Sequence, residues 1–160
     1  MTVSSPAYAD FVAAARAGTA RYHDRARAIR DGYRRIGSDA PAMGEHWVRP
    51  GLLLDGRFEP ARPPILAYVT VRGRPVLAGV AYARPLAAGE KPPDFPGLPG
   101  VWHDHSGTVE AELAPVHDAS HRAPDGPRVA VLHAWVWIEN PDGLFATANP
   151  ALAAMRGEEP

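Results

Sequence analysis

The chain has 160 residues, a length typical of one domain that buries its own core without covalent cross-links. Its 17 basic and 18 acidic residues give a formal net charge of -1, so no overall field favours nucleic acid or an anionic membrane as a partner. The chain has no cysteine, which excludes disulfides, thiolate metal sites, iron–sulfur clusters and covalently attached c-type haem. Any metal ligand must therefore supply nitrogen or oxygen.

The beginning of the sequence lacks the basic segment and long apolar stretch of a signal peptide. No other window approaches the roughly 20 apolar residues of a membrane span. We therefore expect a soluble, cytoplasmic protein.

The first predicted element is a helix over residues 6–36. Pro6 suits its first turn, and Gly37 with the following "SDAPAMG" ends it. Gly18 lowers the helix propensity, so one long helix and two helices with a bend at Gly18 both stay open. The apolar residues recur at spacings of three and four, which is typical of one helix face: Tyr8, Phe11, Val12, Ala15, Thr19, Tyr22, Ala26, Ile29, Tyr33 and Ile36.

Three strands follow. Residues 65–71 and 75–85 read as strands separated by a short turn at residues 72–74, which predicts a hairpin. Residues 128–140 are apolar on both sides and predict a central strand. The period of two places one row of side chains on a single face: Val129, Val131, His133, Trp135 and Trp137. Residues 85–100 and 117–127 predict loops, and residues 141–160 predict a turn, at most a short helix, and a short frayed tail. The expected fold is a single α+β domain, a long N-terminal helix packed on a small, mainly antiparallel sheet within residues 44–140.

The stretch "GVWHDHSGTVEAEL" carries two histidines, His103 and His105, separated by one residue. On an extended segment both side chains point to the same side, about 7 Å apart along the chain, a distance that one metal ion can bridge. Glu110 or Glu112 can supply an oxygen after the following turn. Two histidines and one carboxylate leave coordination positions open for water, dioxygen or substrate. The alternative is a pair of solvent-exposed loop histidines.

Two more histidines are candidate ligands. His133 lies in the most apolar segment of the chain, where a polar ring needs a partner: a metal ion, a backbone carbonyl, or a carboxylate such as Glu139 or Glu45. His46 follows the turn residue Gly44, and the alternative for it is an exposed loop position. All four tryptophans lie close to these histidines in sequence, which is typical of a small-molecule pocket, with Trp47, Trp102 and Trp135 as its expected walls.

Two resemblances add to this reading. The segment "GLPGVWHDHSGTVE" is similar to the first cupin motif, with Gly97, His103, His105 and Glu110 at the motif positions. The second cupin motif is not matched around His133, where Trp137 stands in place of its asparagine. The combination "MGEHW", "WHDHSG" and "LHAWVWIENPDGLFA" resembles a family of small bacterial proteins without an assigned function, which implies a self-contained domain.

The sequence therefore predicts a mononuclear metal site and, on it, a small-molecule metalloenzyme of the oxygenase or hydrolase type. Its expected ligands are His46, His103, His105 and His133, with Glu45 or Glu110 as orienting group, ligand or general base. Zn, Fe, Cu, Ni and Mn all suit such ligands. The alternative is a metal-free domain that binds a small molecule, noncovalent haem or a partner protein. A homo-oligomer is compatible with either reading.

Overall fold

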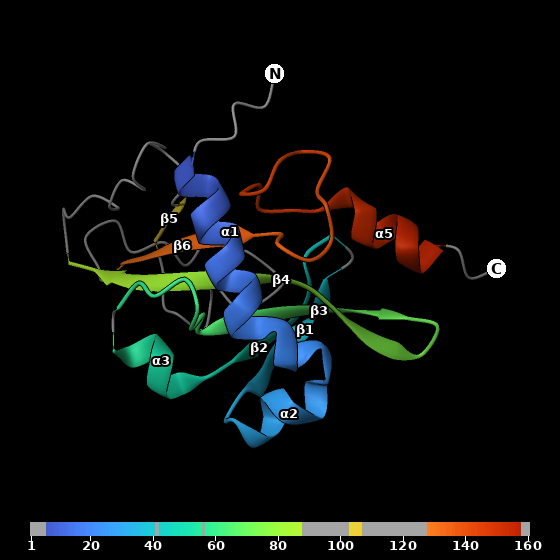
Figure 1. Ribbon diagram of the computed structural model, residues 1–160, viewed down its shortest axis with the longest axis horizontal. Coiled ribbons are helices and arrows are strands. Elements are labelled where there is room, and N and C mark those ends of the chain that lie inside the picture. The colour runs from blue at the N-terminus through green and yellow to red at the C-terminus, as the bar shows by residue number, and fades with distance from the viewer. Residues whose placement is uncertain (1–5, 41, 56, 88–102, 107–127, 158–160) are drawn as a thin grey trace.

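A six-stranded antiparallel sheet forms the centre of the computed structural model, which describes residues 6–40, 42–55, 57–87, 103–106 and 128–157 (Figure 1). The strand order in these residues is β1-β2-β3-β4-β6-β5. In chain order the elements are α1 (Pro6–Thr19), the 3-10 helix η1 (Ala20–His23), α2 (Arg25–Arg30), β1 (Arg34–Ala40), β2 (Gly44–Val48), α3 (Pro50–Leu54), β3 (Ile65–Val71), β4 (Arg74–Leu86), β5 (His103–Ser106), β6 (Arg128–Ala134) and α5 (Pro150–Gly157). The predicted α+β class, with an N-terminal helix packed on the sheet, is confirmed. No helix within these ranges is long and apolar enough to cross a membrane.

The N-terminal helical region is shorter and more interrupted than the predicted helix over residues 6–36. α1 ends at Thr19, whose hydroxyl donates to the carbonyl of Ala15 (2.6 Å). Asp24 then caps α2, because its carboxylate accepts the backbone N–H of Ala26 (3.0 Å). Gly32 follows α2 with a φ of 106°, a conformation that ends helices. Residues 34–40 form β1 instead of helix.

The predicted end of this helix was wrong because two apolar residues continue the helical spacing outside any helix. Tyr33 is buried, and its hydroxyl donates to the carbonyl of Pro63 (2.6 Å). Ile36 lies on β1 and packs on the other face of the sheet. Gly18 is the second-last residue of α1, close to the point where the helix is interrupted. A Cβ there would lie 1.9 Å from the carbonyl oxygen of Ala61, so glycine is needed for close approach.

The predicted hairpin is present as β3 and β4. Arg72 and Gly73 form the two-residue turn, with φ values of 50° and 76°. These angles match the turns that join twisted antiparallel strands. The hairpin supplies the two middle strands, so every site residue on β2 or β6 is positioned against it.

The last predicted strand is also too long, since β6 ends at Ala134 and not at residue 140. The backbone N–H groups of Trp137 and Ile138 both donate to the carbonyl of Ala78 (3.1 and 3.0 Å). In a regular strand, successive residues pair with successive partners. Here two consecutive amides share one carbonyl, so the strand ladder is interrupted. The chain therefore bends away after Ala134.

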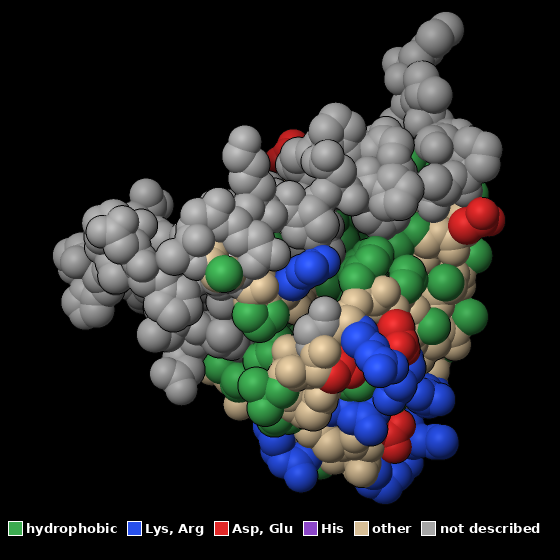
Figure 2. Space-filling view, turned by 90° about the vertical axis from the view of Figure 1, so that its left-hand side faces the viewer, with side chains coloured by type: hydrophobic (Ala, Val, Ile, Leu, Met, Phe, Trp, Pro, Cys, Tyr) green, Lys and Arg blue, Asp and Glu red, His purple; other side chains and the backbone are tan. Residues whose placement is uncertain are grey.

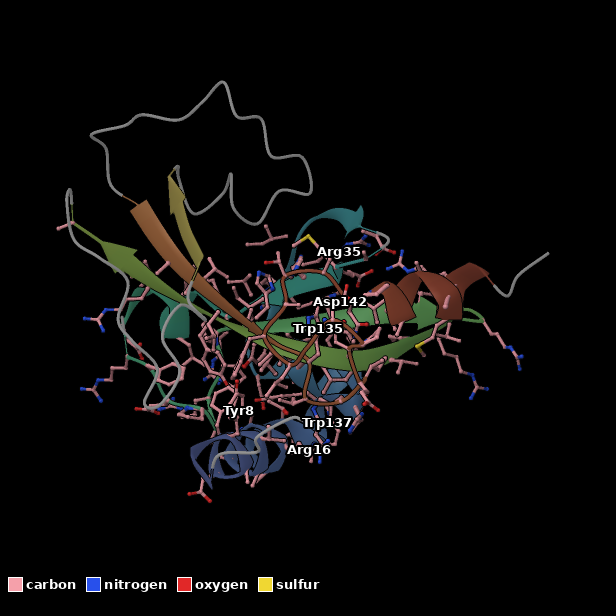
Figure 3. All side chains as sticks on the ribbon, turned by 90° about the horizontal axis from the view of Figure 1, so that it is seen from above. Tyr8, Arg16, Arg35, Trp135, Trp137 and Asp142 are labelled. Atoms are coloured by element: carbon pink, nitrogen blue, oxygen red, sulfur yellow. The ribbon has the colours of Figure 1, made fainter. Side chains whose placement is uncertain are left out.

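This bend divides the predicted row of His133, Trp135 and Trp137. The indole N–H of Trp137 donates to the hydroxyl of Thr19 on α1 (3.0 Å). Figure 3 shows Trp137 beside Arg16 on the α1 side of the sheet. Trp135 stays with the opposite face. The prediction that both tryptophans share a face with His133 was wrong for Trp137.

The two faces of the sheet carry different cores. α1 crosses one face, here called the helix face, over the largest cluster, which includes Phe11, Tyr22, Leu66, Tyr68, Tyr82 and Leu132 (Figure 1). The opposite face, here called the distal face, carries two smaller clusters. One contains Val48, Ile65, Ala81, Ala83 and Val131 and is joined by Leu53 of α3. The other contains Ala67, Val69, Ala78, Trp135 and Leu152 of α5.

The C-terminal segment contains one short helix, α5, which the prediction for residues 141–160 allowed, and this helix packs on the sheet. Leu152 of α5 is fully buried against the distal face. The backbone N–H of Asn149 donates to the carbonyl of Ala42, in the connection between β1 and β2 (2.7 Å). The predicted loops over residues 85–100 and 117–127 lie outside the described residues, apart from 85–87.

Candidate metal centre

The distal face brings two histidines together. His46 on β2 and His133 on β6 have ring centroids 6.4 Å apart, with the rings inclined at 67°. Both residues are buried, with exposed fractions of 7% and 8%. β3 and β4 lie between their strands, so the backbones are about 14 Å apart at the usual strand spacing. The side chains must therefore extend toward each other along the sheet surface.

Small residues make this approach possible. His46 pairs with Ala67 on β3, and His133 pairs with Ala81 on β4. Ala67 in turn pairs with Gly79, where an added Cβ would lie 2.7 Å from the carbonyl oxygen of Ala134. The methyl groups of Ala67 and Ala81 leave room above the sheet that a longer side chain would fill. Glycine at position 79 serves a different purpose, since it allows the close approach of the β6 backbone.

The surroundings favour a neutral His46. Burial lowers the pKa of its imidazole below the usual value, while the nearby charge of Asp39 acts in the opposite direction. The neutral ring is the form that binds metals, because one nitrogen then carries a free lone pair. The His46 side chain is therefore ready to act as a ligand at neutral pH.

The separation of the rings sets a geometric limit. A metal ion bound to an imidazole nitrogen at about 2.0–2.1 Å lies roughly 3.2 Å from the ring centroid. Two such ligands have centroids about 5.2 Å apart in tetrahedral geometry and about 6.4 Å apart in a linear one. The observed 6.4 Å is at the linear limit. A tetrahedral site requires the two rings to approach by about 1 Å.

Further ligands must come from elsewhere. Among the residues that the structure describes, no group of three or more His, Cys, Asp or Glu side chains is arranged to hold a metal ion. The β5 backbone lies beside β6, with His103 paired to Val131 and His105 paired to Val129. These partners alternate along β6 in the same row as His133. The side chains of His103 and His105, and the whole of Trp102 and Glu110, lie outside the described part of the chain.

Glu45 is not brought to the histidines. It lies on the helix face, where its carboxylate accepts the indole N–H of Trp47 (2.5 Å). It also pairs with the guanidinium groups of Arg25 (3.0 Å) and Arg35 (3.5 Å). Arg25 stacks over the Trp47 ring, 5.2 Å from its centroid. Glu45 and Trp47 therefore belong to an ionic and aromatic cluster on the other side of the sheet from His46.

Trp135 is the one predicted pocket tryptophan that the described residues place on the distal face. It is 4% exposed, and its indole N–H donates to the carbonyl of Ala146 (2.7 Å). It packs in the same cluster as Ala67, the residue paired with His46. Its hydrogen-bonded indole makes it a rigid apolar wall near the histidines.

Two charged residues near the histidines, Asp39 and Arg156, carry no sequence signal that marks them as site residues. Asp39 lies on β1, next to the strand of His46, and forms an ion pair with Arg156 of α5. The two residues come from opposite ends of the chain, so no local pattern in the sequence signals their contact. This ion pair places one negative and one positive charge near the histidine site.

Comparison with known proteins gives no family for this chain: no family model matches it, and neither a curated protein nor a solved structure is significantly similar.

Proposed function

We propose that this chain binds one transition-metal ion through histidines on the distal face and uses it on a small organic molecule. The observation that carries the proposal is the approach of His46 and His133 on a sheet face that carries two apolar clusters. Two buried imidazoles that approach each other on one sheet face are a frequent basis of metal sites.

We assign the third ligand to His103 or His105. The support is the register of β5, which pairs both positions with the row of β6 that carries His133. Glu110, soon after this strand in the sequence, is the candidate for a carboxylate ligand or a general base. Glu45 is left out of the proposed set because it is bound to Arg25 and Arg35 on the helix face.

The proposed ligands define the chemistry in outline. Nitrogen and oxygen donors without sulfur suit Zn, Fe, Cu, Ni and Mn. Two or three histidines leave coordination positions for water, dioxygen or a substrate oxygen. A metal held in this way activates bound water or polarises a carbonyl, as in hydrolases, or binds dioxygen, as in oxygenases.

The proposed partner is a small molecule and not nucleic acid or a membrane surface. Figure 2 shows arginine side chains interspersed with carboxylates, so the visible face carries both signs of charge. Ion pairs such as Arg27 with Asp31 and Arg62 with Glu59 have the same effect. A cytoplasmic location and a homo-oligomeric state stay predictions from the sequence.

Elemental analysis and an absorption spectrum of the untagged full-length protein test the proposal. We expect about one equivalent of a single transition metal. We expect His46→Ala and His133→Ala each to lose the metal. His23→Ala is the control, because His23 packs on Trp137 (4.2 Å between ring centroids) on the helix face and should keep the metal.

Three results would contradict the proposal. One is the absence of metal even after metals are supplied. Another is equal metal content in all three variants. The last is a strong Soret band, which would identify haem as the bound group and favour the haem-binding alternative.

A further inference from the structure

We infer that the ion pair between Asp39 and Arg156 tunes the affinity of the histidine site for a divalent cation. Asp39 acts as a positioning residue whose negative charge attracts the cation toward His46, and Arg156 moderates that attraction. This inference rests on the proposed metal binding by His46 and His133.

Asp39 has the location that this role requires. β1 is hydrogen-bonded to β2, and Ile36 on β1 pairs with His46. The register is irregular between Ile36 and Ala40, the interval that contains Asp39.

The ion-pair partner of Asp39, Arg156, belongs to α5, whose residue Leu152 packs on the distal face. α5 also lies against the start of β2, because a Cβ at Gly44 would be 3.7 Å from Leu152 Cδ1. The carboxylate of Asp39 therefore lies toward the face that carries His46, where a negative charge attracts a cation.

Arg156 is held in place by the packing of α5. Leu152, one turn before it, is fully buried against the distal face. The start of α5 is tied to the β1–β2 connection by the hydrogen bond from Asn149 to Ala42 (2.7 Å). The side chains of Arg156 and Asp39 are 22% and 31% exposed. Solvent therefore screens their charges only in part.

The two charges have opposite effects on a cation. Removing the carboxylate of Asp39 leaves the positive charge of Arg156 near the site, which should weaken cation binding. Removing the charge of Arg156 leaves the carboxylate unopposed, which should strengthen it. If the ion pair had only a structural role, a different result would be expected. Substituting either Asp39 or Arg156 would then weaken metal binding, because the same contact is lost in both variants.

The test is a Zn²⁺ titration of the full-length protein against a competing chelator at pH 7.5. We expect Asp39→Asn to weaken binding about tenfold and Arg156→Gln to tighten it about threefold to tenfold. Arg156→Lys, which keeps the charge, should stay close to the unmodified chain. Glu59→Gln and Arg62→Gln are the matched controls, because they remove an exposed ion pair (3.5 Å) and should leave the affinity unchanged.

A melting temperature for each variant separates folding from binding. We expect both Asp39→Asn and Arg156→Gln to lower the melting temperature, while their Zn²⁺ affinities change in opposite directions. Weaker binding in both, or unchanged binding in both, would overturn the tuning role alone. An unmodified chain that does not bind Zn²⁺ or any other transition metal stoichiometrically would overturn the proposed function, and this role with it.

Discussion

Glu45 and His46 are neighbours in β2 and face opposite sides of the sheet. Glu45 binds Arg25 and Arg35 on the helix face, and His46 meets His133 on the distal face. The alternation of side chains along a strand imposes this separation. Adjacent residues of the motif "EHW" therefore have different roles, one in an ionic cluster and the other in the proposed metal site.

Glu45→Gln should lower stability without loss of metal. The Glu45 side chain is only 7% exposed, and its replacement leaves two arginines without their carboxylate. We expect the free energy of unfolding to fall by about 1–3 kcal/mol. Urea unfolding measures this change, and elemental analysis of the folded variant should give the same metal content as the unmodified chain. A folded but metal-free Glu45→Gln protein would contradict the separation of the two faces.

Ala67→Leu should fill the space that the two imidazole rings need. Ala67 is 5% exposed and pairs with His46, so the added atoms enter the distal face beside the ring. We expect a loss of about 1–3 kcal/mol of stability from overpacking. Metal affinity should fall at least tenfold, since the rings can no longer approach. Isothermal titration with Zn²⁺ measures the affinity.

Ala15→Leu is the control for this change. Ala15 is fully buried on the helix face, so the same increase in volume strains the other core. We expect a similar loss of stability with unchanged Zn²⁺ affinity. If both variants lost the metal equally, general destabilisation would explain the effect, and the role of Ala67 would be wrong.

Local patterns in the sequence predicted the class of fold and its central hairpin. The turn at Arg72 and Gly73 and the apolar strands around it are signals within a few residues, and the structure agrees with them. The end of the helix was misplaced because Tyr33 and Ile36 keep the helical spacing by coincidence. Their burial depends on contacts with other elements of the fold.

The site was predictable only in part, for a similar reason. A histidine in an apolar strand is a local signal, which marked His133 as a candidate. His46 was a candidate because it follows the turn residue Gly44. The face that Glu45 occupies depends on the strand phase of β2, a segment that the sequence presented as a turn. The ion pair of Asp39 with Arg156 depends on the docking of α5 and has no local signal.

The stability of the metal-free protein should fall in mild acid because of His46. Burial lowers the pKa of this ring in the folded state, and the charge of Asp39 offsets only part of that effect. The unfolded chain has the usual histidine pKa of about 6.5, so it binds more protons than the folded chain as the pH falls. Stability from this group is therefore fully present above about pH 7.5 and is lost as the pH drops through 6.5 toward the lower folded-state pKa.

Urea unfolding between pH 8 and pH 5, with chelator present, measures this dependence. The slope from one such group is at most about 1.4 kcal/mol per pH unit. His46→Gln keeps a neutral polar side chain without the titration, so its stability should change less over the same range. Identical slopes for the two proteins would show that His46 does not carry the effect.

Gly44→Ala should damage both the fold and the site. Gly44 begins β2 with a φ of 76°, and a Cβ there would lie 2.6 Å from the backbone oxygen of Tyr68. Gly73 has the same φ but open space around its Cβ position, which makes Gly73→Ala the matched control. Both variants should lose about 1 kcal/mol through the strained backbone angle. Gly44→Ala should lose a further 1–3 kcal/mol, roughly, through the clash.

Because the clash displaces β2, only Gly44→Ala should also weaken Zn²⁺ binding by His46. Equal stability and affinity in the two variants would contradict the close packing of β2 on β3.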